Sequence, residues 1–444
     1  KKLSKKLLFT VCSILRQYAL VLLPKRTFLT NEYKCNEAWK LQISSPILTK
    51  VNLNDFYNIL DQNFLSKGII SAIDVDIFAN AVRDPVYLEE LKDLLHKLRL
   101  SAETGNTLES THHATIRNYM EFGNIQELIQ ILQDPLNFGV FLDFYTANML
   151  LDKLITSQEY EYASNVASFI MLQEDFTNDI TNTLCQYASY KYLSEYMGPS
   201  EEPIISQEEN KKKEEIKIRI KFLRNPYFDD HFDIKDLKTL SGKTLALMSK
   251  SSNDNVSCNL QIIGWLFYKK YDKLFSLCKQ VAEKKNFKLC TEVVELINKE
   301  IELLEEDTKI ILCQCIEVLN KAPVADTKLE NSLKIAIENA INRIQNKDIA
   351  AQKKLFSNWE QIREDKLEAQ SKRLDRANRI KNIMEKQKQM QVEEQKLWFF
   401  ENEEDIDLQI EEKEKLEDTS SVKKTGQQKD DEDYIPPEIL PKRK

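Results

Sequence analysis

The sequence predicts an all-α protein: an α-solenoid of degenerate helix-turn-helix repeats, then a second helical block and a long charged helix. Three observations favour this class. The 444 residues include only 8 glycines and 11 prolines, whereas β-rich folds use these residues in frequent turns. Pairs of amphipathic segments recur at about 36 residues, a period typical of helical solenoids. From Pro323 to Gly426 the chain has no further proline or glycine.

The first 31 residues have the composition of a mitochondrial transit peptide. They hold seven basic residues and no acid, among many leucines, serines and threonines. Arg26–Phe28 also resembles a matrix-protease cleavage site. A membrane anchor over Leu7–Leu23 would place Arg16 at its middle, where a charge is costly, and a secretory signal would need an unbroken apolar run. We therefore expect a transit peptide over residues 1–31, a protein of the mitochondrial matrix, and no membrane span.

Residues 32–198 are expected to form the solenoid. A mixed segment with Tyr33 and Trp39 precedes the repeats, whose first helices should start near residues 75, 111, 145 and 181. One helix pair cannot bury its apolar face alone, so each pair must stack on its neighbours. In the third unit the small residues Ala163 and Ala167 should let the helices approach closely. The inward stripe of its first helix is apolar: Leu150, Leu151, Leu154 and Ile155.

The remaining chain divides by composition. Pro203 and the run SQEENKKKEE indicate a linker over residues 199–212, before a second helical block over 213–345. Residues 346–400 are dense in Lys, Glu, Gln and Arg, which predicts a long solvent-exposed helix. Its apolar residues thin out after Leu355, Trp359 and Ile362, so we expect it to dock by one end through Trp359. The acidic tail, 401–444, is predicted to be disordered.

The sequence offers no catalytic or metal-binding pattern. It lacks GxxxxGK[ST], HExxH and GxSxG motifs. None of the eight cysteines forms a CxxC pair, and Cys313 and Cys315 would point about 200° apart on a helix. The four histidines are scattered, and the His112–His113 pair is interpreted as a partly exposed helix feature. We expect no enzyme activity, no cofactor, no metal, no disulfide and no small-molecule substrate.

The charge distribution limits any RNA contact to a local surface. The formal net charge is −8, and residues 401–434 hold 14 acids against 5 lysines. The best local candidate is residues 372–388, where Lys372, Arg376 and Arg379 share one helical face. The alternative is a solvated helix held by i,i+4 charge pairs. The only acids in this segment are Asp375 and Glu385. Its basic residues are Lys372, Arg373, Arg376, Arg379, Lys381, Lys386 and Lys388.

The segments YTANMLLD and EYEYAS resemble a pentatricopeptide repeat. In that family an Asn or Thr early in the first helix and an Asp near the repeat's end face RNA. The resemblance therefore implies RNA contacts for Asn148, for His113 at the same position one unit earlier, and for either Asn178 or Asp179 at the late position. Alternatively, Asn148 is a helix residue satisfied by water. Because the few units are degenerate, binding of RNA shape or backbone is favoured over reading one base per repeat.

A second resemblance is more specific. KRTFLTNEY, Trp39 and ILQDPLNFGVFLDFYTANMLLDKLI resemble the pentatricopeptide-repeat proteins of the mitochondrial small ribosomal subunit, best over residues 25–193. Weaker similarity follows at SCNLQIIGWLFYKK and DIAAQKKLFSNWEQI. The resemblance implies a non-catalytic structural protein that contacts small-subunit rRNA and neighbouring ribosomal proteins. Two alternatives stay open: a free mitochondrial RNA-binding factor acting on transcripts or tRNA, and a helical-repeat adaptor that binds only proteins.

Overall fold

The computed structural model describes residues 27–195, 234 and 236–421, with short gaps at 253, 285–286, 304–305 and 326. Within these residues the regular secondary structure is helical, apart from one isolated bridge between Leu289 and Val324. This confirms the all-α prediction. Internal contacts divide the chain into two units, residues 1–364 and 365–444. The predicted linker 199–212 lies outside the described residues, as do most of the predicted transit peptide and residues 422–444.

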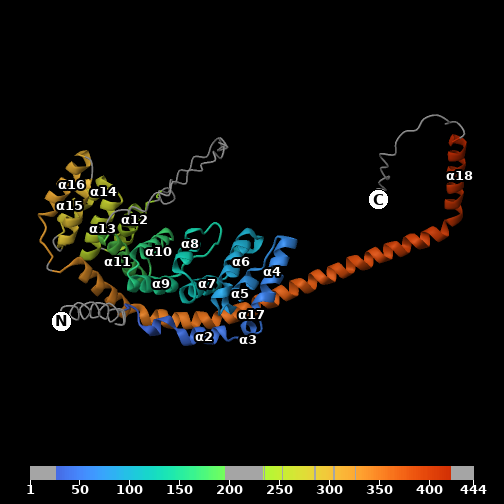
Figure 1. The fold of residues 1–444 in the computed structure, drawn as a ribbon, viewed down its shortest axis with the longest axis horizontal. Coiled ribbons are helices and arrows are strands. Elements are labelled where there is room, and N and C mark those ends of the chain that lie inside the picture. The colour runs from blue at the N-terminus through green and yellow to red at the C-terminus, as the bar shows by residue number, and fades with distance from the viewer. Residues whose placement is uncertain are drawn as a thin grey trace, which may run out of the picture. The chain divides into compact units, whose positions relative to one another are not determined.

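The first unit contains the predicted stack of helical hairpins (Figure 1). Their first helices begin at Ala72, Glu109, Phe144 and Asp179, which are 35 to 37 residues apart, so the predicted repeat spacing is confirmed. Four N-terminal elements precede them: η1 (Asn31–Lys34), α2 (Asn36–Ile43), α3 (Pro46–Thr49) and α4 (Leu53–Lys67). The repeat helices are α5 (Ala72–Ala81), α6 (Leu88–Leu100), α7 (Glu109–Glu121), α8 (Ile125–Gln133), α9 (Phe144–Ser157), α10 (Tyr160–Leu172) and α11 (Asp179–Glu195).

Local sequence explains why these helices begin and pack where they do. The Asp143 side chain caps α9 by accepting a hydrogen bond from the Thr146 backbone N–H at 3.2 Å, and Asn124 caps α8 in the same way. The predicted inward stripe of α9 is buried, and so are Ala163 and Ala167 of α10. Since alanine leaves room for the facing backbone, the two helices of this hairpin pack closely.

The second helical block continues the same packed unit. Its described helices are α12 (Leu237–Met248), α13 (Asn255–Phe267), α14 (Tyr271–Ala282), α15 (Thr291–Leu303) and α16 (Glu306–Leu319). Helix α12 contacts α10 and α11 on one side and α13 on the other. The crossing of α12 and α13 is close, because a Cβ placed on Gly264 would lie only 2.4 Å from the backbone nitrogen of Ala246. The two predicted helical blocks therefore form one body.

The C-terminal part differs from its prediction in two respects. Helix α17 (Leu329–Glu401) begins 17 residues before the predicted boundary at 346, because Leu329, Leu333 and Ile337 form a buried apolar stripe that extends it backwards. Within the tail predicted to be disordered, residues 403–421 form α18 (Glu403–Ser421), since this segment is rich in the helix formers Glu, Lys and Leu. All side chains from 371 to 396 are exposed.

Candidate nucleic-acid interface

The first part of α17 lies along the first helices of the repeats (Figure 1). Glu330, near its start, accepts a hydrogen bond from Tyr187 of α11 at 3.4 Å. Further along, Asp348 accepts one from Tyr33 at 3.4 Å, and Arg363 pairs with Asp76 of α5. The start of α17 therefore contacts the last repeat, and the helix then runs back along the repeats until Arg363 contacts the first one. The repeat face on which the RNA-contacting residues were predicted is the face that α17 contacts.

Asn148 is fully buried beneath the N-terminal segment, and both ends of its amide are used. Its Nδ2 donates to the Tyr33 hydroxyl at 2.9 Å, and its Oδ1 accepts from the Thr181 hydroxyl at 2.8 Å. Burial also raises the pKa of Tyr33, so that hydroxyl stays protonated. The predicted RNA contact, and the alternative of satisfaction by water, are both corrected: the N-terminal segment folds over Asn148, which joins it to α9 and α11.

His113 is likewise internal. Its ring is surrounded by four aromatic rings with centroids 5.2–5.8 Å away, from Trp39, Tyr145, Phe356 and Trp359. Burial, together with the nearby Arg117 charge, lowers the pKa of His113 to about 3, so the ring is neutral. The predicted RNA contact is corrected here too, because α17 covers the ring. Two of the four aromatic residues belong to α17, which confirms that Trp359 packs this helix onto the body.

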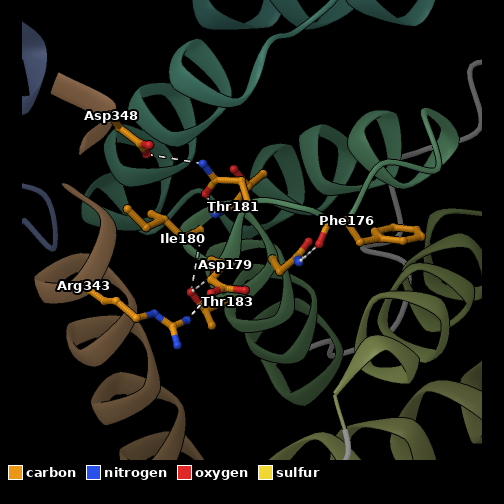
Figure 2. A network of polar contacts seen from close by, with 9 residues as sticks. Phe176, Asp179, Ile180, Thr181, Thr183, Arg343 and Asp348 are labelled. Atoms are coloured by element: carbon orange, nitrogen blue, oxygen red, sulfur yellow. Dashed lines mark hydrogen bonds and ion pairs between the residues drawn. The ribbon is translucent and has the colours of Figure 1, made fainter. Parts of the chain in front are cut away.

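Asp179 lies at the junction between α11 and α17 (Figure 2). Its carboxylate forms an ion pair with Arg343 of α17, and their side chains are 46% and 67% exposed. The neighbouring Asn178 donates from Nδ2 to Asp348 at 3.3 Å, while its Oδ1 caps α11 through the Thr181 N–H. The late position of this repeat therefore contacts α17. Because Asp179 remains half exposed, its predicted RNA contact stays a prediction.

The strongest contact between α17 and the repeats was not predicted. Arg363 and Asp76 are 1% and 0% exposed at their side chains, and Nε lies 2.6 Å from Oδ2. The other oxygen of Asp76 accepts hydrogen bonds from Ser110 and Thr111 of α7. With its amide oxygen turned toward Arg363, Gln42 accepts from both terminal nitrogens at 3.0 and 2.8 Å. The sequence feature that could have indicated this contact is the position of Asp76 within the apolar segment AIDVDIFANA.

The predicted basic residues of α17 lie in the second unit. Lys372, Arg373, Arg376, Arg379 and Lys381 are all exposed, and we call them the basic stripe. Lys372 pairs with Glu368 at 2.6 Å and Lys381 with Glu385 at 3.9 Å, both four residues apart. Arg376 and Arg379 form no ion pair within the described part of the chain. The stripe thus combines solvated i,i+4 pairs with two arginines that can bind an external anion.

Among the residues that the structure describes, no group of three or more His, Cys, Asp or Glu side chains is arranged to hold a metal ion. None of the helices there combines the length and apolarity that crossing a bilayer requires.

One comparison with known protein families gave a match over nearly the whole chain. The family model described as mitochondrial 28S ribosomal protein S27 matches residues 3–430. The match includes the repeats, the second helical block, α17 and α18.

Proposed function

The chain belongs to the family of mitochondrial 28S ribosomal protein S27, and from this premise we propose that it binds small-subunit rRNA and neighbouring ribosomal proteins as a non-catalytic structural component. Membership makes it a component of the small subunit of the mitochondrial ribosome, and hence mitochondrial. The proposal adds that it works in the matrix in support of translation, through the surfaces described next.

The observation that carries the rRNA proposal is the full exposure of the basic stripe. Lys372, Arg376 and Arg379 lie on one face and span about 10 Å of helix axis, so they can reach adjacent phosphates of one strand. Each phosphate that they neutralise releases condensed counterions, which favours binding without reading sequence. The predicted base-reading positions Asn148 and His113 are internal, which also favours backbone recognition.

A separate apolar cavity supports the contact with proteins. It has a volume of about 640 Å³ and lies between the end of α8, the following loop and the end of α10. Leu136 is 78% exposed, and Phe141 and Leu172 are also exposed at this cavity. Asp134 and Glu174 line it, whereas no lysine or arginine does. We propose that it receives an apolar side chain from a basic segment of a neighbouring ribosomal protein.

The rRNA proposal is tested by the salt dependence of binding. The variant Arg376→Gln/Arg379→Gln should weaken binding of the full chain to small-subunit rRNA and reduce the slope of log K against log[salt] by about 1.5, because two phosphate contacts are lost. The matched control, Lys353→Gln/Lys354→Gln, removes two exposed charges from the same helix outside the stripe. An unchanged slope in the first variant, or an equal change in the control, would exclude the stripe.

Sedimentation of mitochondrial lysate tests the two alternatives. A structural component should stay with the small subunit in stoichiometric amount. A free RNA-binding factor would run in light fractions, and a protein-only adaptor would remain in its complex after ribonuclease treatment. Either of these results would contradict the proposed role.

A further inference from the structure

A second cavity lies between the first helices of two adjacent repeats, α7 and α9. Its volume is about 410 Å³, and the N-terminal segment completes its wall with Thr27, Lys34 and Asn36. Three cationic side chains line it: Lys34, Arg117 and Lys153. None of them forms an ion pair with a carboxylate in the described part of the chain. Arg117 is buried, Lys153 is half-buried and Lys34 is exposed at the opening, and burying positive charges close together is costly unless an anion shares the space.

Arg117 has hydrogen-bonding capacity that the protein leaves unused. The side chain is 4% exposed and stacks over Trp39, with its guanidinium carbon 4.8 Å from the ring centroid. Nη2 donates to the Lys34 carbonyl oxygen at 3.0 Å and to Asn36 Oδ1 at 2.7 Å. Nη1 is buried with no hydrogen-bond partner. A buried guanidinium nitrogen rarely stays unpaired, so an oxygen acceptor is expected beside it.

The two lysines add positive charge to the same space. Burial lowers the pKa of Lys153, and the charge of Lys34 lowers it further, so the two ammonium groups repel each other. Lys153 donates to the carbonyl oxygen of Met120, a neutral partner, and the charges of Glu121 and Glu159 only partly offset the lowering of its pKa. A bound oxyanion would remove both costs at once, because it attracts the two lysines together.

Two acids, Asp152 and Glu121, also line the cavity and offset part of its positive charge. Asp152 Oδ1 accepts hydrogen bonds from the backbone N–H groups of Phe28 and Leu29 at 2.8 and 3.2 Å, so this carboxylate is committed to holding the N-terminal segment. Glu121 is exposed at the rim. The three cations therefore outnumber the two carboxylates, and hydroxyl groups such as that of Thr156 can donate further hydrogen bonds.

We propose that this cavity binds a phosphate group, held by Nη1 of Arg117 and by the ammonium groups of Lys34 and Lys153. The phosphate can belong to an RNA backbone or to a free ion or nucleotide, since the binding chemistry is the same. The site goes beyond the function proposed above because it lies in the repeats and does not use the basic stripe.

The test measures phosphate binding to the full chain carrying Arg376→Gln/Arg379→Gln, so that RNA cannot bind through those stripe arginines. Calorimetric titration would use inorganic phosphate, pyrophosphate and a short oligoribonucleotide as probes. At least one should bind, and Lys34→Gln/Lys153→Gln should weaken that binding about tenfold or more because two charge-assisted contacts are lost. The control Lys50→Gln removes an exposed charge that does not line the cavity and should leave binding unchanged.

The two sources give different results in the same titrations. Binding of inorganic phosphate or pyrophosphate would identify a free ion or nucleotide as the ligand, and binding of the oligonucleotide alone would identify an RNA phosphate. The proposal is overturned if no probe binds, or if the double lysine variant, with an unchanged melting temperature in the absence of ligand, binds as tightly as its parent. A failure here would leave the salt slope of the stripe unaffected, so the two proposals are tested separately.

Discussion

Replacing Arg363 by methionine should release α17 from the repeats. Methionine keeps much of the length and apolar volume of the side chain but removes the charge beside Asp76. The Asp76 carboxylate is fully buried, and its remaining side-chain hydrogen bonds come from neutral groups: the hydroxyls of Ser110 and Thr111 and the amide of Asn80. Removing one partner of a buried ion pair costs about 3–5 kcal/mol, because the other charge is left uncompensated. That loss is a large part of the total stability of an ordinary protein.

Arg343 provides the matched control on the same helix. It also pairs with an aspartate of the repeats, but both side chains are substantially exposed. An ion pair in water contributes about 0–1 kcal/mol, so Arg343→Met should change the unfolding free energy little. A second comparison, Arg363→Met combined with Asp76→Leu, should recover most of the stability because no buried charge remains.

Two assays distinguish a local effect from a global one. Denaturant unfolding gives the loss of free energy, and hydrogen exchange shows whether the backbone amides of residues 343–363 lose protection. We expect a loss of at least about 3 kcal/mol for Arg363→Met, with increased exchange in this segment. If Arg363→Met and Arg343→Met behave alike, or if exchange in α17 stays unchanged, the buried pair does not hold this helix.

Three further predictions concern other parts of the chain. As the pH falls below about 6.5, the unfolded state binds a proton at His113 that the folded state, with its pKa near 3, does not bind. Wild type should therefore lose about 1.6 kcal/mol more than His113→Phe over the whole range from pH 6.5 to 5 in denaturant unfolding, and equal losses would contradict this. Gly264→Ala should lower the unfolding free energy by about 1–3 kcal/mol, because its Cβ would clash with the α12 backbone. The control Gly105→Ala, whose Cβ meets nothing within 4 Å, should melt like wild type. Equal melting temperatures for the two variants would refute the close crossing. Leu136→Lys should lower the incorporation of the protein into the small subunit, measured on density gradients. Its melting temperature should not fall, because this side chain is already exposed. Normal incorporation would show that the apolar cavity does not bind a neighbouring protein.

The repeats could be predicted from the sequence because their signals are local. A helix pair is encoded by apolar spacing within about 30 residues, and the caps at Asn124 and Asp143 lie within three residues of the amides that they bind. The expected starts near 111, 145 and 181 fall within two residues of the observed ones. The predicted docking of Trp359 also followed from a local signal, a large apolar side chain within a charged helix.

The contacts of α17 with the repeats could not be predicted in the same way. Arg363 and Asp76 are 287 residues apart, and a pattern of charges along a helix indicates a solvated face whether or not another surface meets it. The same limit explains the corrections at Asn148 and His113. Their polar side chains do occupy one face of the repeats, but that face is covered by the Tyr33 segment and by α17, which no local pattern reveals.

Site-specific cross-linking in the assembled small subunit tests most directly which part of the protein meets rRNA. A photoreactive residue would be placed at Arg376, in the exposed basic stripe, and in a second sample at Asn148, beneath Tyr33. We predict cross-links to small-subunit rRNA from position 376 and none from position 148. Cross-links to rRNA from position 148 with none from position 376 would show that the repeat face opens to bind RNA, which would contradict the account.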